Sequence, residues 1–193
     1  MPKVLLLSLS VLLLLLSSGS SLSAAQEQKT TENKIDTIKF NGSDYYFRWS
    51  QAGQYEFTPA GQEDLNSWTE MLTLRVYPKI IDGDSLATQA NGVLSNYKNS
   101  KGNILRTNSI PSTAEKPAEH FIAAMLGGPQ FLEFAAARFL LVGGKGVGVI
   151  YSRRAYGTQA PQELGPWVVQ NGAPVEKVMM EFNPATAISS LEK

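Results

Sequence analysis

The segment from Phe131 to Gly157, FLEFAAARFLLVGGKGVGVIYSRRAYG, constrains the fold more than any other stretch of the chain. Two apolar runs flank a glycine-rich centre, which is the pattern of two β-strands joined by a tight turn. We place the turn at Gly144-Lys145, so that the two strands form an antiparallel hairpin. The rest of the chain is then expected to build a sheet around this hairpin.

The predicted pairing gathers three polar side chains on one face of the hairpin. With the turn at Gly144-Lys145, Arg138 lies opposite Tyr151, and Ala136 lies opposite Arg153. Opposite side chains in an antiparallel pair are about 5 Å apart, close enough for cation–π contacts. Arg138, Tyr151 and Arg153 are therefore our candidate partner- or anion-binding residues. The alternative is that these side chains fix the strand register and cover a solvent-facing surface.

Several further strands are predicted by alternation of apolar and polar residues. In one of them, Met71 to Tyr77, the side chains of Leu72, Leu74 and Val76 are all apolar, which indicates a strand with one buried face. Turn residues separate most of these runs, so we expect neighbouring strands to pair antiparallel. The predicted strands before and after the Met71 run are 35–40, 45–50, 54–58, 101–110 and 120–126.

Helical periodicity appears in three places. An apolar stripe from Leu86 to Tyr97 follows Asp84, whose carboxylate can cap the first turn. A short helix is predicted at 166–170, with Asn171-Gly172 as its terminator. A further amphipathic helix carries apolar side chains at i, i+3, i+4 and i+7, namely Val175, Val178, Met179 and Phe182.

These elements predict a single α+β domain with a mostly antiparallel sheet and flanking helices. We assign residues 35–182 to this domain. The polar residues 26–34 are expected to form a flexible lead-in, and residues 183–193 a C-terminal tail.

Residues 1–25 have the organisation of a secretory signal peptide. Lys3 precedes the apolar run Val4–Leu16, and Ser23-Ala24-Ala25 is a small-residue cleavage site before Gln26. The run is shorter than the roughly 20 residues that a membrane-spanning helix needs. We therefore expect a periplasmic or secreted protein that does not span the membrane after cleavage.

Charge and cysteine content exclude several classes of protein. Without the signal, which contains Lys3, 16 basic residues remain against 17 acidic ones, so no electrostatic attraction to nucleic acid is expected. The chain has no cysteine, which excludes disulfides and a lipid-anchored cysteine. The expected partner is an envelope protein or a small ligand.

The residues that carry common enzyme chemistries are sparse. His120 is the only histidine, which argues against a serine triad and against a zinc site. The loop 143–148, GGKGVG, lacks the Ser or Thr that follows the lysine of a nucleotide-binding loop. No cofactor or metal is expected. The remaining chemistry is a carboxylate pair, which five acidic residues could supply: Glu63, Asp64, Glu70, Glu133 and Glu181.

Two segments resemble a group of exported bacterial proteins of unknown function. The first is Phe57–Pro78, FTPAGQEDLNSWTEMLTLRVYP. The second is Phe131–Gly157, with Glu133, Arg138 and the YSRR motif at 151–154. The order of elements also resembles the PsbP/DcrB-like α/β/α sandwich. This resemblance implies a small accessory or binding domain and transfers no site residues.

Three functions remain open at this point. The first is a non-enzymatic accessory domain that binds an envelope component through an exposed aromatic–arginine face. The second is a carrier of a small apolar or amphipathic ligand held between sheet and helices, with Trp68 and Trp167 as candidate lining. The third is a hydrolase that uses two carboxylates in one cleft.

Overall fold

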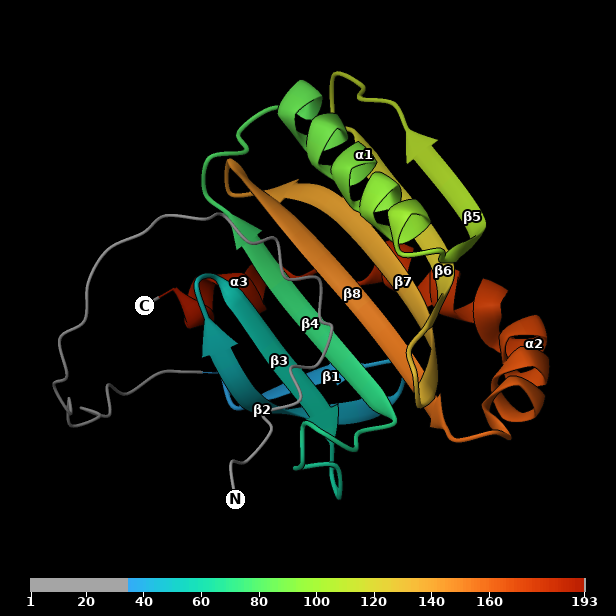
Figure 1. Cartoon of the computed structure of the whole chain (residues 1–193). Helices are drawn as coiled ribbons and strands as arrows, with labels where there is room; N and C mark the ends of the chain where they lie inside the picture. Colours follow the sequence, from blue (N-terminus) through green and yellow to red (C-terminus); the bar gives the residue numbers. More distant parts are fainter. Residues whose placement is uncertain (1–34, 193) are drawn as a thin grey trace, which may run out of the picture.

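Eight strands and three helices make up residues 35–192, the part of the chain that the computed structural model describes. The predicted signal peptide and lead-in lie outside these residues. The strands belong to one antiparallel sheet, with helices on both of its faces (Figure 1). The predicted single α+β domain is therefore confirmed. The elements are β1 Thr37–Phe40, β2 Ser43–Gln51, β3 Gln54–Pro59, β4 Glu70–Tyr77, α1 Gly83–Asn99, β5 Asn103–Ile110, β6 Glu119–Gly127, β7 Phe131–Val142, β8 Lys145–Tyr156, α2 Ala160–Glu181 and α3 Ala185–Leu191.

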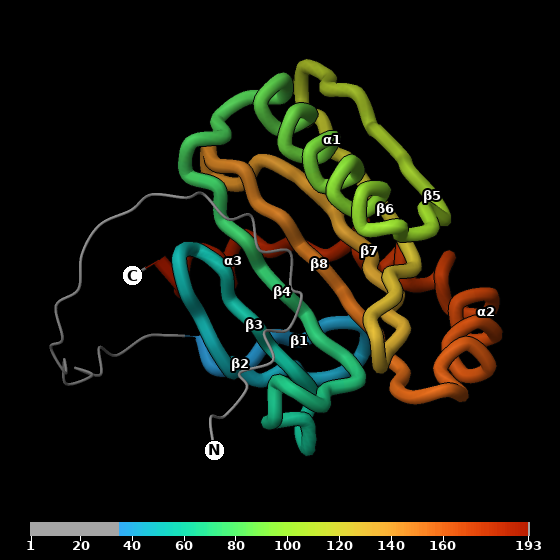
Figure 2. The backbone as a smooth tube through the Cα atoms, in the orientation of Figure 1, coloured from blue at the N-terminus to red at the C-terminus, as the bar shows by residue number. Residues whose placement is uncertain are grey.

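The hairpin of β7 and β8 lies at the centre of the sheet. The strand order is β1-β2-β3-β4-β8-β7-β6-β5, and every neighbouring pair is antiparallel. The four N-terminal strands therefore join the four C-terminal ones through the pair β4 and β8. Figure 2 shows this path, with β1–β3 on one side of the hairpin and β5 on the other.

The turn of this hairpin lies one residue earlier than the sequence predicted. Val142 pairs with Lys145, which leaves Gly143-Gly144 as the turn. Both glycines have positive φ, 56° and 78°, a conformation that a two-residue hairpin turn requires and that a lysine would adopt only with strain. Arg138 is consequently opposite Val149 instead of Tyr151. The predicted pairings were wrong by two residues, and an even shift leaves every side chain on its predicted face.

Each face of the sheet has its own apolar core. On one face, α2 packs against β7 and β8, and apolar residues of α3 and of β1–β4 join the same cluster. On the other face, α1 packs over β5, β6 and β7. The apolar stripe predicted for α1 is confirmed, since Leu86, Ala90, Val93 and Tyr97 are buried. The N-cap is Asp82 and not Asp84, because Asp82 accepts a hydrogen bond from the backbone of Ser85 at 2.8 Å.

The C-terminal helices differ from the prediction. α2 is continuous across Asn171-Gly172, where the sequence predicted an end, and it also contains Pro166 and Pro174. Burial of apolar side chains along the whole helix outweighs the cost of the glycine, about 1 kcal/mol. The predicted tail 183–193 contains α3, which buries Ala187, Ile188 and Leu191 in the core. No helix within residues 35–192 has the length and hydrophobicity that crossing a membrane requires.

Candidate functional site

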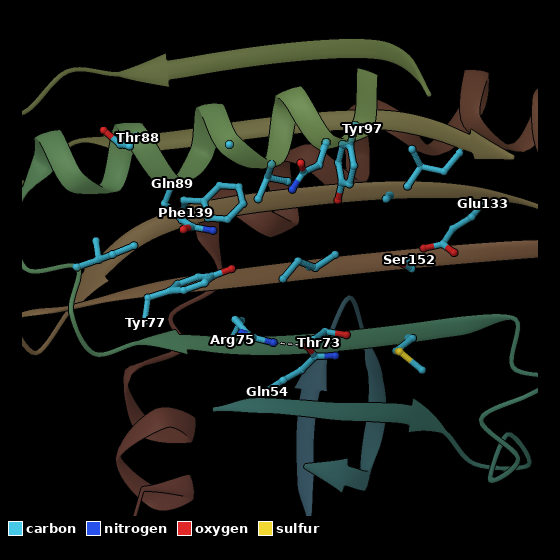
Figure 3. A pocket seen from close by; sticks show the side chains of 18 of the residues that line it. Gln54, Thr73, Arg75, Tyr77, Thr88, Gln89, Tyr97, Glu133, Phe139 and Ser152 are labelled. Atoms are coloured by element: carbon cyan, nitrogen blue, oxygen red, sulfur yellow. Dashed lines mark hydrogen bonds between the residues drawn. The ribbon is translucent and has the colours of Figure 1, made fainter. Parts of the chain in front are cut away.

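A groove runs between α1 and the neighbouring strands of the sheet (Figure 3). Because α1 packs over β5, β6 and β7, the same face of β4 and β8 remains uncovered beside it. The groove has a volume of about 570 Å³, which is within the range of small-molecule sites. We call this space, lined by α1, β4, β7 and β8, the α1 groove.

The floor of the α1 groove is apolar. It is formed by side chains that alternate along the central strands and by the edge of the α1 core. Trp68 and Met71 continue this surface at one end, and both are almost fully buried. The apolar part of a ligand that covers this floor would be shielded from water. This burial would stabilise the complex by about 25 cal/mol for each Å² of apolar surface removed from water. The floor residues are Val93, Leu126, Ala135, Phe139 and Ile150.

The wall that α1 contributes is polar but uncharged. Ser85, Thr88, Gln89 and Asn96 follow one another at helical spacing, beside the buried apolar stripe. Gly92 occupies the middle of this wall. A Cβ added there would meet no atom within 4 Å, so the space over Gly92 is open. A mid-helix glycine costs about 1 kcal/mol relative to alanine, and here it leaves room in the groove.

The opposite wall comes from alternate residues of β4, including Thr73, Arg75 and Tyr77. Nη1 of Arg75 donates to Oε1 of Gln54 at 2.6 Å, and Nε2 of the same Gln54 donates to Glu56 at 2.7 Å. The guanidinium also lies 5.8 Å from the ring centroid of Tyr77. Within residues 35–192, no carboxylate forms an ion pair with Arg75.

The far end of the α1 groove holds a carboxylate, that of Glu133. Its Oε2 forms a 2.7 Å ion pair with Nε of Arg154, whose guanidinium lies between the rings of Trp68 and Phe131 at 4.1 and 4.2 Å. Glu133 lines the groove, whereas Arg154 lies behind it. Burial, and then the nearby charge of Glu133, raises the pKa of the Tyr97 hydroxyl. Nε1 of Trp68 and Nη2 of Arg154 are buried and have no hydrogen-bond partner within residues 35–192.

The three residues predicted as a binding patch lie on the other side of the sheet. Arg138, Tyr151 and Arg153 share a face, as predicted, but α2 covers this face. Arg138 is 5% exposed and Tyr151 is 1% exposed. Nε and Nη2 of Arg138 bind the Glu119 carboxylate at 2.8 and 2.7 Å, and its Nη1 donates to two backbone carbonyls at the end of α2. The exposed aromatic–arginine face is therefore not present.

Arg153 is the most accessible of the three, with a side chain that is 24% exposed. It forms an ion pair with Glu70 and lies 4.7 Å from the ring centroid of Trp167. Trp167 also stacks on Tyr151, so it belongs to the α2 core. Of the two tryptophans predicted to line a ligand site, Trp68 lines the α1 groove and Trp167 does not.

The acidic residues considered for a hydrolase do not meet in this groove. Within the described part of the chain, Glu133 is the only carboxylate that lines it. Glu70 pairs with Arg153, and Glu63 is an exposed partner of Arg48. Between residues 35 and 192, no group of three or more His, Cys, Asp or Glu side chains has a geometry that could hold a metal ion.

His120 lies near the start of β6, in agreement with the predicted strand 120–126. Its Nδ1 lies 2.9 Å from Oγ of Ser109, a pairing across β5 and β6 that the sequence analysis did not find. Its Nε2 is buried and has no hydrogen-bond partner in the described part of the chain. Burial lowers the pKa of the imidazole. A general base needs an acidic or carbonyl partner to orient the ring, and this ring has none at its second nitrogen.

The α1 groove is shaped by three residues that were not predicted from the sequence: Arg75, Gln89 and Gly92. A signal for Arg75 was available, since alternation in Met71–Tyr77 places it opposite the buried face of that strand. For Gly92 the signal was a glycine inside a helical pattern, which is often retained for a packing or functional reason.

The fold and the groove define an α+β domain with one uncovered, partly apolar sheet face beside a helix. A protein-family model matches residues 33–171, and the chain belongs to this family, which is a family of uncharacterised proteins. No curated protein sequence matches the chain.

Three solved structures are similar at low sequence identity. A Mog1 mutant protein has 8% identity and a TM-score of 0.47, over 75% of this chain and 92% of that chain. The Ran-binding protein Mog1p of Saccharomyces cerevisiae has 7% identity and a TM-score of 0.39, over 62% and 76%. Human STARD10 has 9% identity and a TM-score of 0.31, over 71% of each chain.

Proposed function

We propose that this protein is a non-enzymatic binding domain that holds a small amphipathic ligand in the α1 groove. The observation that carries the proposal is the combination of an apolar floor with walls of hydroxyl and amide groups. Such a site buries the apolar body of a ligand and offers hydrogen bonds to its polar parts, as small-molecule sites do. The open space over Gly92 gives the ligand access to the floor.

This proposal takes up the second of the three functions that the sequence left open. The accessory-domain hypothesis depended on an exposed aromatic–arginine face, and that face is covered by α2. The hydrolase hypothesis depended on two carboxylates in one cleft, and among the described residues Glu133 is the only carboxylate that lines the α1 groove. The carrier hypothesis depended on a cavity lined by aromatic residues, and Trp68, Tyr77, Tyr97 and Phe139 line this one.

Two variants with the same added side chain test the proposal. Gly92→Leu fills the groove, and Gly165→Leu adds leucine to a glycine of α2, where a Cβ also meets no atom within 4 Å. Leucine is a better helix former than glycine, so neither variant is expected to melt at a lower temperature. The purified protein is titrated with the neutral dye Nile red, with decanol as competitor.

We expect Gly92→Leu to weaken dye binding by about tenfold or more, because the apolar floor is no longer accessible. Gly165→Leu should bind as the unmodified protein does. Equal binding by both variants, or no binding by the unmodified protein, would show that the α1 groove is not a ligand site.

We also propose that the protein is exported and that its fold is a PsbP/DcrB-like α/β/α sandwich. The signal-like sequence at residues 1–25 supports export, and the placement of α1 and α2 on opposite faces of the sheet supports the sandwich. Expression of the full chain in a bacterial host, followed by N-terminal sequencing of the periplasmic product, tests the export proposal. The expected first residue is Gln26. A product that keeps Met1 and stays with the cells would contradict it.

A further inference from the structure

The α1 groove has opposite charges at its two ends. Among residues 35–192, Arg75 and Glu133 are the only charged side chains that line it. Figure 3 shows them apart, with Arg75 beside Gln54 and Tyr77, and Glu133 beside Ser152 at the other end. The charges differ in how they are compensated. Glu133 has its ion pair with Arg154, whereas Arg75 forms no ion pair with any residue from 35 to 192.

The guanidinium of Arg75 is oriented by one hydrogen bond to Gln54. Its Nη1 donates to Gln54 at 2.6 Å, and no hydrogen bond of its Nε or Nη2 is found within the described chain. A guanidinium presents a planar fork of donors that matches the two oxygens of a carboxylate. The side chain is half-buried, so a charge-assisted hydrogen bond here is less screened than one on an open surface.

The end of the groove at Glu133 disfavours an anion. Its carboxylate lines the groove, and the compensating guanidinium of Arg154 lies behind it between two aromatic rings. An anion placed at this end would face the carboxylate first. Trp68 and Met71 lie toward this end, because the Trp68 ring is 4.1 Å from the Arg154 guanidinium and Met71 pairs with Ser152, whereas Arg75 pairs with Gly148.

From this arrangement we propose that the ligand of the α1 groove is an amphipathic anion, an acyl-chain carboxylate whose head group binds Arg75. The inference rests on the proposed function and names the class of ligand for the same site. The acyl chain extends over the floor toward Met71 and Trp68. Met71 lies four positions before Arg75 on the same strand, a distance of about 13 Å, which suits a chain of medium length.

Three probes of equal chain length and different charge test the inference: decanoate, decanol and decylammonium. Their affinities for the purified protein are measured by calorimetry at low salt and again at high salt. We expect decanoate to bind about tenfold more tightly than decanol, with decylammonium the weakest, because a charge-assisted hydrogen bond distinguishes the head groups. The advantage of decanoate should shrink at high salt, since ions screen the half-exposed guanidinium.

Two arginine variants locate the head-group site. Arg75→Gln is expected to remove the advantage of decanoate and to leave decanol binding unchanged, whereas Arg75→Lys keeps part of it. Arg106→Gln is the matched control, because Arg106 is an exposed arginine of β5 that pairs with Glu176 of α2 and does not line the groove. Its affinities should equal those of the unmodified protein.

The outcomes separate this inference from the proposed function. Failure of all three probes to bind the unmodified protein would overturn the proposed function and the inference together. Equal binding of decanoate and decanol would keep the ligand site and overturn its preference for an anion. Preference for decylammonium would place the charged head at Glu133 and overturn the assignment to Arg75. These comparisons use the unmodified protein, so they stand even where an arginine variant fails to fold.

Discussion

Arg138 of the central strand β7 donates a hydrogen bond from Nη1 to the carbonyl oxygen of Phe182, the C-cap residue of α2, at 2.8 Å. The same nitrogen donates to the carbonyl of Met179, also at 2.8 Å. The last carbonyls of a helix have no partner within the helix, and the negative end of its dipole favours a cation. Arg138 therefore joins the middle of the sheet to the end of α2.

Loss of this junction is expected to lower the stability of the fold. Arg138→Met is expected to destabilise the protein by about 3 kcal/mol, because it leaves the Glu119 carboxylate and the two α2 carbonyls without their buried partner. Arg106→Met is the comparison, and we expect it to cost about 0–1 kcal/mol, since Arg106 is an exposed ion-pair partner. Urea unfolding of both variants gives the two free energies. Equal values would show that Arg138 is not a junction.

For Arg138, the sequence predicted the face of the sheet on which the side chain lies. It did not predict which helix covers that face. Alternation along β7 and β8 placed Arg138, Tyr151 and Arg153 on one face, and this holds despite the error in the turn, because an even shift conserves faces. The pattern does not contain the information about which helix covers that face. Small side chains such as Ala136 give no signal of the approach of α2.

The elements that form the α1 groove could also be predicted from the sequence, but their packing could not. The sequence predicted both the strand Met71–Tyr77 with its buried apolar face and the apolar stripe of α1. The groove arises because α1 packs over β6 and β7 and leaves β4 uncovered, which is a matter of tertiary packing. The helix end predicted at Asn171-Gly172 was wrong for a related reason. Burial of apolar side chains along α2 outweighs the low helix propensity of Gly172.

Two glycines at α1 should respond in opposite ways to a single added methyl group. At Gly102, after the end of α1, a Cβ would lie 2.6 Å from Cδ2 of Leu126 and 2.7 Å from the carbonyl oxygen of Tyr97. The backbone carbonyl has little freedom to move, so Gly102→Ala is expected to destabilise the protein by about 1–3 kcal/mol. At Gly92 the added methyl meets no atom, and Gly92→Ala should stabilise by about 1 kcal/mol.

Thermal and urea unfolding of the two alanine variants, measured side by side, test this pair of expectations. A stabilising effect at Gly102 would mean that the end of α1 is not packed against Leu126 as described. A destabilising effect at Gly92 would mean that the space above that residue is filled, which would also weaken the argument for an open groove.

Glu56 of β3 is expected to make the protein less stable as the pH rises. Its side chain is 5% exposed, and burial raises the pKa of the carboxyl, while the hydrogen bond from Gln54 and the charge of Arg154 lower it in part. Because the pKa is higher in the folded protein than in the unfolded chain, the folded state binds the proton more strongly. The stabilising contribution is thus complete below the unfolded pKa, about 4.3, and is lost as the pH rises through the folded pKa.

Glu56→Gln should therefore raise the free energy of unfolding at pH 7 and have little effect below pH of about 4. The amide oxygen that this substitution introduces can still accept the hydrogen bond from Gln54. Glu63→Gln is the matched control with the opposite sign, because backbone hydrogen bonds at Glu63 and Gly61 lower the pKa of the Glu63 carboxyl. That variant should lose stability at pH 7, and the loss should disappear as acid protonates the carboxyl. Urea unfolding of both variants between acid and neutral pH gives the two profiles. A Glu56→Gln variant that is less stable than the unmodified protein at pH 7 would mean that the ionised carboxylate is favoured in the fold by Arg154.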